Sequence, residues 1–200
     1  VSVADYVLSR AKADGVKNLV TVSNLSSSRA LRDVTESYGG TYFASAVGEV
    51  NATTLMHEKG AIIGGEGNGG VIYPAIHSGR DAMVGVALFL SNLAHKKMTV
   101  SELKKTYPEY HIAKNKIELS DKGLIDKILS ELKVIYAHEN VNDIDGVKIS
   151  FEDKREWVHL RKSNTEPIIR IYSEAPTEEE AVKLSEKVIA VAEKIISSAK

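Results

Sequence analysis

The chain has 200 residues, a formal net charge of −1 and 43% hydrophobic residues. A charge this close to zero argues against a surface that neutralises many nucleic-acid phosphates, and the absence of cysteine excludes disulfides and cysteine-based zinc sites. No apolar run approaches the roughly 20 residues of a membrane span, and no basic and apolar leader opens the chain. We therefore expect one or two cytoplasmic domains that bind neither nucleic acid nor membrane.

The first half of the chain alternates helix and strand signals. Ser2 and Asp5 form a possible capping pair for a helix that ends at Gly15, and the serines of residues 26–28 are placed to cap a second helix. Short strands separated by helical crossovers indicate an α/β layer with a mixed, mostly parallel sheet. The predicted strands are residues 19–22, 41–46, 61–63 and 71–73, and the further helices are residues 52–58 and 81–94.

The pattern changes at residues 99–110, which we expect to be a linker with a short helix at residues 101–106. Beyond it the signals predict a small α+β domain with an antiparallel sheet and two helices. Ser120 is expected to cap the first of these helices, and Thr177 with Glu180 forms a capping-box pair for the last. The predicted domains are residues 1–98 and 111–200; the strands of the second are residues 111–119, 146–151, 157–160 and 168–172.

The turn between the last two predicted strands, which we call the arginine turn, gathers hydrogen-bond donors. Its guanidinium groups are always charged and present a planar fork of donors that suits phosphate. Consecutive N–H groups in a turn can also form an anion-binding concavity. The composition favours a phosphate clamp about as strongly as an ordinary hairpin with an arginine on each strand. The arginine turn reads Arg161-Lys162-Ser163-Asn164-Thr165-Glu166-Pro167-Ile168-Ile169-Arg170.

A glycine-rich segment at residues 64–70, the glycine loop, follows the strand at 61–63 and reads Gly-Gly-Glu-Gly-Asn-Gly-Gly. It satisfies the G-x-G-x-x-G spacing, but a dinucleotide site requires a helix directly afterwards. Residues 71–74 are extended and end in proline, so we reject a nucleotide site. Glycines permit close backbone approach, and Glu66 and Asn68 supply acceptors and donors that suit vicinal sugar hydroxyls. The alternative is a plain turn with a solvated glutamate.

Together these segments resemble two signatures of the α-D-phosphohexomutase superfamily, which comprises phosphoglucomutases, phosphomannomutases and phosphoglucosamine mutases. The arginine turn matches the R-x-S-N-T-E-P pattern and following arginine of the last domain, and the glycine loop lies upstream, as the sugar-recognition loop does. The chain therefore resembles a C-terminal fragment with most of domain 3 and all of domain 4. Many bacterial relatives carry G-E-x-S-G-H where this chain has Asn68 and Gly70, which leaves substrate preference open.

The resemblance implies an activity for the full-length protein. Phosphohexomutases interconvert hexose 1-phosphate and hexose 6-phosphate through a phosphoserine and a bisphosphorylated intermediate, with Mg²⁺ at the reacting end. The family's serine loop, T-A-S-H-N-P, and metal loop, D-G-D-x-D-R, belong to the first two domains and do not occur in this sequence. We therefore expect a substrate-binding half that depends on N-terminal domains of the same chain, is inactive alone, and has no catalytic or metal-binding residue of its own.

The resemblance also implies which residues contact a hexose phosphate. Glu66 and Asn68 would contact ring hydroxyls, and Glu49 would be a further substrate contact, although an acid there also suits a helix N-terminus. Residues 77–81 are interpreted as structural, with Gly79 making a turn and with Arg80 and Asp81 fixing the next helix. The phosphate clamp would consist of Arg161, Ser163, Asn164, Thr165 and Arg170.

Two other interpretations stay open. A stand-alone, non-catalytic phosphosugar-binding or regulatory module would use the same clamp and glycine loop, and a structural domain would carry both motifs by chance. The six histidines show no metal-ligand spacing. The sequence does not distinguish glucose, mannose and glucosamine phosphates, and it does not fix an oligomeric state.

Overall fold

The computed structural model describes residues 1–119, 123–163 and 166–198. The chain divides into two compact units, Val1–Glu109 and Tyr110–Lys200. The predicted cap at Ser120 and the predicted clamp residues Asn164 and Thr165 lie outside the described residues.

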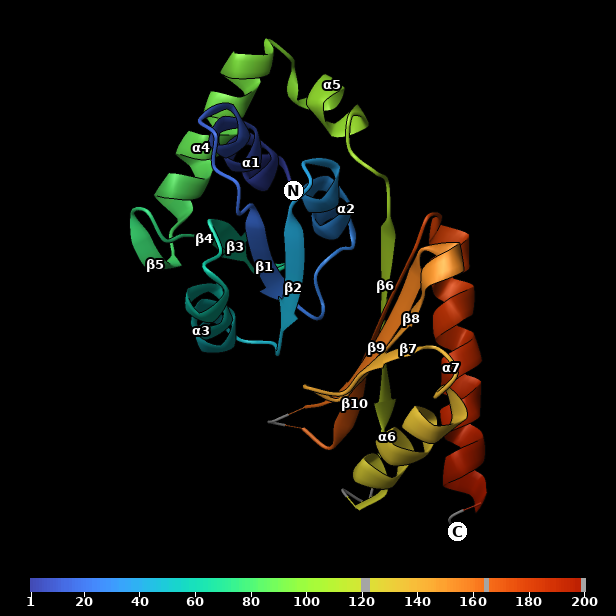
Figure 1. Ribbon diagram of the computed structural model, residues 1–200. Coiled ribbons are helices and arrows are strands. Elements are labelled where there is room, and N and C mark those ends of the chain that lie inside the picture. The colour runs from blue at the N-terminus through green and yellow to red at the C-terminus, as the bar shows by residue number, and fades with distance from the viewer. Residues whose placement is uncertain (120–122, 164–165, 199–200) are drawn as a thin grey trace. The chain divides into compact units, whose positions relative to one another are not determined.

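The first unit contains a five-stranded sheet of β1 (Val20–Asn24), β2 (Thr41–Ser45), β3 (Ile63–Gly65), β4 (Val71–Tyr73) and β5 (His77–Arg80). Its order is β2-β1-β3-β4-β5 (Figure 1). β1 runs parallel to β2 and β3, whereas β4 is antiparallel to both β3 and β5. The sheet is mixed, as predicted, but not mostly parallel, because the glycine loop folds β3 and β4 into a hairpin and β5 extends that antiparallel edge.

Helices pack on both faces of this sheet. Alternation along β1 sends Val20 and Val22 to one face, where they contact Met56 of α3, and Thr21 to the other, where it bonds Thr35 of α2. Asp81 caps α4 by accepting a hydrogen bond from the N–H of Val84 at 3.0 Å. The helices are α1 (Ser2–Ala13), α2 (Ala30–Ser37), α3 (Glu49–Lys59), α4 (Ala82–Lys96) and α5 (Val100–Lys105).

Asp5 is a structural anchor and not the capping residue predicted for α1. The first turn of α1 has no side-chain cap, and Asp5 is buried. Its carboxylate accepts hydrogen bonds from the hydroxyls of Tyr38 and Tyr107, each at 2.6 Å, and from Lys96 Nζ at 2.5 Å. Burial alone would raise the pKa of Asp5, but these hydrogen bonds and one from Asn92 together lower it.

The segment predicted to be a linker contains α5 and contacts the first unit. α5 begins with a capping box between Thr99 and Glu102, and Leu103 is buried. The hydroxyl of Tyr107 reaches Asp5, so the chain is bound to the first unit up to that residue. The role of residues 99–110 as a linker stays a prediction.

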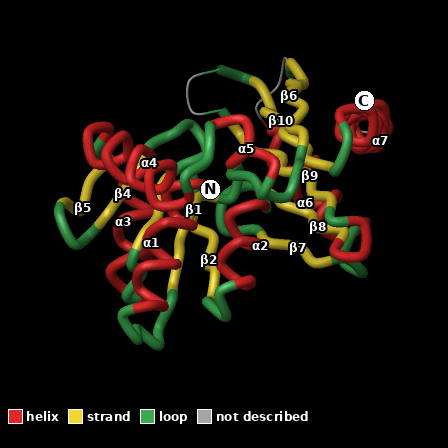
Figure 2. The backbone as a smooth tube through the Cα atoms, turned by 90° about the horizontal axis from the view of Figure 1, so that it is seen from above, coloured by secondary structure: helices red, strands yellow, loops and turns green. Residues whose placement is uncertain are grey.

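The second unit is built on an antiparallel five-stranded sheet with the order β6-β10-β9-β8-β7 (Figures 1 and 2). One face of the sheet packs against α6 and α7 in a hydrophobic core that includes Ile128, Leu160 and Val188. No helix in the described parts of the chain has the length and hydropathy to cross a membrane. The elements are β6 (His111–Glu118), α6 (Gly123–Ile135), β7 (Asn140–Asn142), β8 (Val147–Phe151), a 3₁₀ turn (Glu152–Lys154), β9 (Glu156–Lys162), β10 (Ile168–Ala175) and α7 (Glu178–Ser198).

Candidate functional site

Glu66 of the glycine loop is held at the carboxyl ends of the parallel strands, where open α/β sheets bind ligands. Asn24, the last residue of β1, donates from Nδ2 to Glu66 Oε1 at 3.0 Å, and the N–H of Gly48 donates to the same oxygen at 3.2 Å. Glu66 Oε2 lies 3.4 Å from Arg80 Nη1. Only 7% of the Glu66 side chain is exposed, so this carboxylate is fixed by neighbours from three segments and is not a solvated turn residue.

The backbone of the glycine loop requires glycine at its ends. Gly65 has φ 149°, and a Cβ there would lie 2.0 Å from the carbonyl oxygen of Gly70. The loop closes as the N–H of Glu66 donates to that same carbonyl at 2.9 Å. Asn68 is exposed, and its Oδ1 accepts from the N–H of Gly70 at 3.1 Å. The strand β4 follows the loop directly, in agreement with the rejection of a dinucleotide site.

Glu49 stands on the first turn of α3 and faces β5. Its Oε1 accepts from the backbone N–H of Arg80 at 2.9 Å, and its Oε2 accepts from Arg80 Nε at 2.7 Å. These bonds from the backbone and the guanidinium lower the pKa of the Glu49 carboxyl group. Glu49 and Glu66 therefore share one guanidinium, which brings two of the predicted sugar-contacting residues together.

Arg80 is the residue of this cluster that the sequence interpretation missed. We predicted that Arg80 and Asp81 fix the start of a helix and that Gly79 makes a turn; Asp81 does cap α4, but Gly79 lies within β5 and Arg80 binds Glu49 and Glu66. The signal that would have located it is strand pairing, since Arg80 is the register partner of Ile72. A short strand with a central glycine gives a weak sequence pattern, which explains the error.

Arg80 also accounts for glycine at position 70. A Cβ on Gly70 would lie 2.4 Å from Arg80 Cδ, so the stem of Arg80 occupies the space that a side chain at position 70 would need. The glycine loop and β5 are thus matched to each other in shape.

In the second unit, the two arginines of the arginine turn face each other across the β9–β10 ladder. Arg161 and Arg170 are direct register partners, and Lys116 of β6 is the partner of Arg170 on its other side. The adjacent residues Leu160 and Ile169 point into the core with α6 and α7, so these three cations occupy the opposite face. We call Arg161, Arg170 and Lys116 the cation row; like charges directly opposite in a sheet are destabilising.

The acidic partners of the two arginines are distant. Arg161 Nε lies 3.8 Å from Asp145 Oδ2, and within the described residues this buried nitrogen has no hydrogen-bond partner. Arg170 Nη2 lies 3.5 Å from Glu166 Oε2, in an exposed contact. Ser163 is buried, and its N–H donates to the carbonyl of Ile168 at 3.0 Å. This hydrogen bond joins the two sides of the turn next to the ends of β9 and β10. Within the described residues, the two arginines of the arginine turn are therefore only loosely paired with carboxylates.

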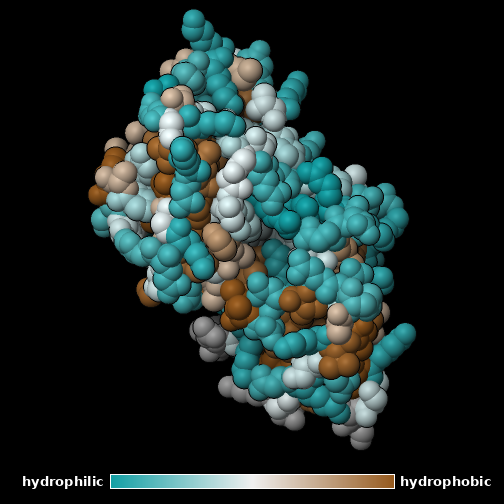
Figure 3. Space-filling view, in the orientation of Figure 1, coloured by the Kyte–Doolittle hydropathy of each residue, from teal (hydrophilic) through white to brown (hydrophobic). Residues whose placement is uncertain are grey.

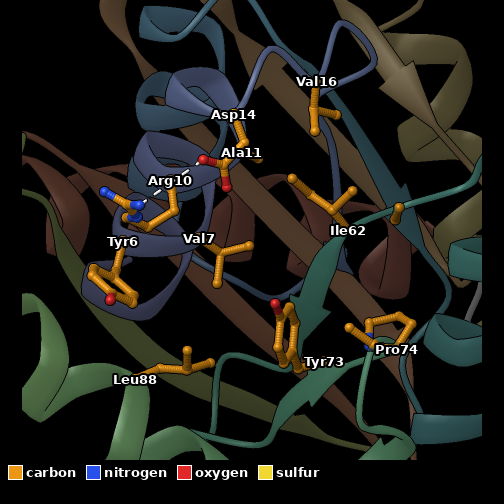
Figure 4. A pocket seen from close by; sticks show the side chains of 12 residues that line it. Tyr6, Val7, Arg10, Ala11, Asp14, Val16, Ile62, Tyr73, Pro74 and Leu88 are labelled. Carbon is orange, nitrogen blue, oxygen red and sulfur yellow. Dashed lines mark ion pairs between the residues drawn. The ribbon is translucent and has the colours of Figure 1, made fainter.

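A separate groove of about 700 Å³ lies in the first unit, between α1 and the segment after β4 (Figure 4). Its walls are mainly apolar, with Tyr6, Ile62 and Tyr73 in the lining and the exposed Arg10–Asp14 pair beside them. None of the predicted site residues lines it. We do not place the sugar site there, because it lacks the paired acceptors found around Glu66.

Beside this groove, α4 exposes an apolar stripe. Met83 and Val86 are exposed on successive turns, with Leu90 beyond them, and Figure 3 shows hydrophobic surface on this part of the first unit. Such a stripe is typical of a surface that contacts another domain or protein. It contains none of the residues of the candidate site.

The described residues contain no group of three or more His, Asp or Glu side chains arranged to hold a metal ion. The acidic residues closest to the candidate site, Glu49 and Glu66, are occupied by Arg80. These described residues therefore do not fit the Mg²⁺ site of a phosphohexomutase.

Comparison with known proteins gives matches in both units. Residues 1–110 match the domain described as phosphoglucomutase/phosphomannomutase, alpha/beta/alpha domain III, and residues 115–191 match that described as phosphoglucomutase/phosphomannomutase, C-terminal domain. A probable phosphoglucosamine mutase of Methanopyrus kandleri is 30% identical over 174 residues, which are 86% of this chain and 38% of that protein. A phosphoglucomutase/phosphomannomutase of Thermococcus kodakarensis is 36% identical over 181 residues, 90% of this chain and 38% of that protein.

A solved structure shares the fold. The crystal structure of Aspergillus fumigatus N-acetylphosphoglucosamine mutase in complex with GlcNAc-6P and magnesium superposes with a TM-score of 0.71 at 15% identity, over 97% of this chain and 42% of that one. The chain therefore spans about two fifths of the length of the proteins it resembles.

Proposed function

The chain belongs to the phosphoglucomutase/phosphomannomutase family, in its domain III and C-terminal domain, and we propose that it is the substrate-binding part of a phosphohexomutase. Such an enzyme interconverts hexose 1-phosphate and hexose 6-phosphate through a phosphoserine and a bisphosphorylated intermediate. In this proposal the arginine turn binds the phosphate that is not reacting, and the glycine loop binds ring hydroxyls.

The cation row is the observation that carries this proposal. Arg161 and Lys116 flank Arg170 as its register partners on the neighbouring strands, and like charges placed in this way are destabilising. Lys116 pairs with Glu118 at 2.7 Å, so the two arginines, with their looser ion pairs, gain most from an anion. A phosphate oxygen accepts from a guanidinium in a charge-assisted bond, and each such bond contributes about 1.5–3 kcal/mol. Among the described residues, the buried Arg161 Nε has no hydrogen-bond acceptor, so this nitrogen can donate to a phosphate oxygen.

The glycine loop supports the other half of the proposal. Its cluster has two carboxylates, Glu49 and Glu66, and one guanidinium, so it is acceptor-rich and repels phosphate. Ring hydroxyls donate as well as accept, and they carry no charge that this cluster would oppose. The glycine-loop cluster therefore suits hydroxyls, and the cation row of the second unit suits phosphate.

We propose that the reacting groups lie outside this chain. The sequence has neither the serine loop nor the D-G-D-x-D-R loop of the family, so preceding domains would supply the phosphoserine and the Mg²⁺ ligands, and the chain alone would be inactive. Two relatives are named for glucosamine, glucose and mannose phosphates, and the solved relative is a complex with GlcNAc-6P. The proposed substrate class is therefore hexose phosphates in general.

Calorimetric titration of the 200-residue chain with glucose 6-phosphate or mannose 6-phosphate tests the clamp. Arg161→Ala and Arg170→Ala should each weaken binding at least tenfold without unfolding the second unit. Lys162→Ala is the matched control: Lys162 lies between them in sequence but pairs with Asp126 of α6 on the other face, and its loss should change the affinity less than twofold. Equal affinity of the arginine variants and the unmodified chain would refute the clamp.

The second candidate, a non-catalytic phosphosugar-binding module, uses the same two sites. Sequencing the coding region upstream of Val1 separates the candidates: a serine loop followed by D-G-D-x-D-R supports the mutase, and a start codon at Val1 supports the module.

A further inference from the structure

We propose that Arg80 is a substrate-binding residue that reads a pair of vicinal ring hydroxyls together with Glu66, an inference that rests on the proposed function. Arg80 is at the end of β5, and its guanidinium lies between the Glu49 and Glu66 carboxylates, 2.7 Å from Glu49 Oε2 and 3.4 Å from Glu66 Oε2. These contacts fix the plane of the guanidinium beside the glycine loop.

The hydrogen bonds that Glu66 already accepts determine which of its carboxylate oxygens can bind a ligand. A carboxylate offers about four acceptor positions, two on each oxygen. Oε1 uses both of its positions for Asn24 and Gly48, whereas Oε2 makes an ion-pair contact with Arg80 Nη1 at 3.4 Å. The acceptor that Glu66 keeps for a ligand is therefore Oε2, the oxygen that faces Arg80, so a hydroxyl bound there lies beside the guanidinium.

Arg80 has the complementary capacity. A guanidinium carries five N–H donors. Nε is taken by Glu49 and Nη1 lies against Glu66, so Nη2 remains, in a side chain of which 46% is exposed. One hydroxyl that donates to Glu66 Oε2 and a neighbouring hydroxyl that accepts from Arg80 would together satisfy both groups.

Asn68 is less suited to this role than the sequence indicated. It is exposed, and its Oδ1 already accepts from the N–H of Gly70 within the loop. Gly70 instead gives room to the Arg80 stem, since a Cβ there would meet Arg80 Cδ at 2.4 Å. The shape of the loop therefore directs Arg80, and not a side chain at position 70, toward the space beside Glu66.

The test is a coupling experiment between Arg80 and single hydroxyls. The 200-residue chain, its Arg80→Gln variant and the control Arg32→Gln, which removes an exposed i,i+4 pair with Glu36, are each titrated calorimetrically with glucose 6-phosphate and its 2-, 3- and 4-deoxy analogues. In the unmodified chain, loss of the recognised hydroxyl should weaken binding at least fivefold. In Arg80→Gln that penalty should shrink to less than twofold, whereas Arg32→Gln should keep it in full.

Each alternative result is decisive. If Arg80→Gln weakens all four ligands by the same factor, Arg80 only supports the loop and the inference is wrong. If no deoxy analogue binds more weakly than glucose 6-phosphate to the unmodified chain, the glycine loop reads no hydroxyl and the inference also falls, while the clamp stands. If glucose 6-phosphate and mannose 6-phosphate do not bind the unmodified chain at all, the proposed function itself fails, and this inference falls with it.

Discussion

The glycine loop and the arginine turn handle charge in opposite ways. In the glycine loop, Glu66 is nearly buried, and its partners come from β1, the loop after β2, and β5. In the arginine turn, Arg161 and Arg170 are register partners, and their ion pairs with Asp145 and Glu166 measure 3.8 and 3.5 Å. The first cluster pairs its charges closely, whereas within the described residues the two arginines of the second have only these looser ion pairs.

This difference indicates what each loop recognises. A hydroxyl binds weakly, so its site benefits from acceptors that are already fixed and need no rearrangement. A phosphate brings charge of its own, and a site of closely spaced cations gains most from its arrival. The repulsion between these like charges lowers the stability of the sheet in the second unit. The other face of this sheet packs into a hydrophobic core.

Charge reversal in the cation row should have the largest effect. Arg170→Glu places a carboxylate between Arg161 and Lys116, so it should weaken glucose 6-phosphate binding a hundredfold or more, because a like charge now faces the phosphate. The same change replaces a repulsive cross-strand pair by attractive ones and should raise the free energy of unfolding by about 0.2–1 kcal/mol. Calorimetry and urea unfolding measure the two effects; loss of both binding and stability would show that Arg170 is structural.

Mild acid should lower the free energy of unfolding of the second unit and leave the contribution of Asp5 to the first unit unchanged. Burial lowers the pKa of His159, which accompanies Arg161 on β9, to about 4; its Nε2 lies 2.6 Å from the carbonyl of Asp145 and is the donor in the neutral ring. Because this value lies below that of an unfolded histidine, the stabilisation is complete above about pH 6.5 and declines as the pH falls toward 4. The second unit should lose about 2 kcal/mol between pH 6.5 and 5.

Trp157, the one tryptophan of the chain, is buried in the second unit, and its fluorescence during urea unfolding reports that loss. In the first unit, the lowered pKa of Asp5 gives stability that is present above about pH 3.8 and is lost only below it. A tryptophan-detected midpoint that does not change between pH 7.5 and 5 would contradict the assignment of a neutral, buried His159.

A smaller effect is expected in the glycine loop. Gly70→Ala puts a Cβ 2.4 Å from Arg80 Cδ, so Arg80 must move and its contacts with Glu49 and Glu66 loosen. We expect about a fivefold loss of hexose phosphate affinity, or about 1 kcal/mol. In an Arg80→Ala background the same substitution should have no further effect on binding. Additive losses in the double variant would mean that position 70 acts independently of Arg80.

Much of the fold could be predicted from local sequence signals. The start of α7 lies at the predicted residues: Thr177 Oγ1 accepts from the Glu180 N–H at 3.3 Å, and the same hydroxyl donates to Glu180 Oε2 at 2.8 Å. The hairpin at the arginine turn and the mixed and antiparallel sheets also follow from alternation, turn residues and crossovers. These features depend on residues close together in the chain.

The errors concern partners that are distant in sequence. Asp5 near Ser2 has the local pattern of a cap, but Lys96 and Tyr107 supply bonds that no local pattern reveals. Arg80 depends on Glu49, 31 residues away, and on a strand too short to predict. Lys116 joins the cation row only through the register of β6 with β10. Tertiary pairing, and not propensity, decides the roles of all three.

The most direct test of the central claim is to map two ligands on the amide NMR spectrum of the 200-residue chain. Inorganic phosphate should shift the N–H signals of Ser163 and Arg170 and leave those of Glu66 and Asn68 in place, and glucose 6-phosphate should shift both sets. If phosphate leaves the arginine turn unchanged, or if glucose 6-phosphate never perturbs the glycine loop, the proposed division of phosphate and sugar recognition between the two units is wrong.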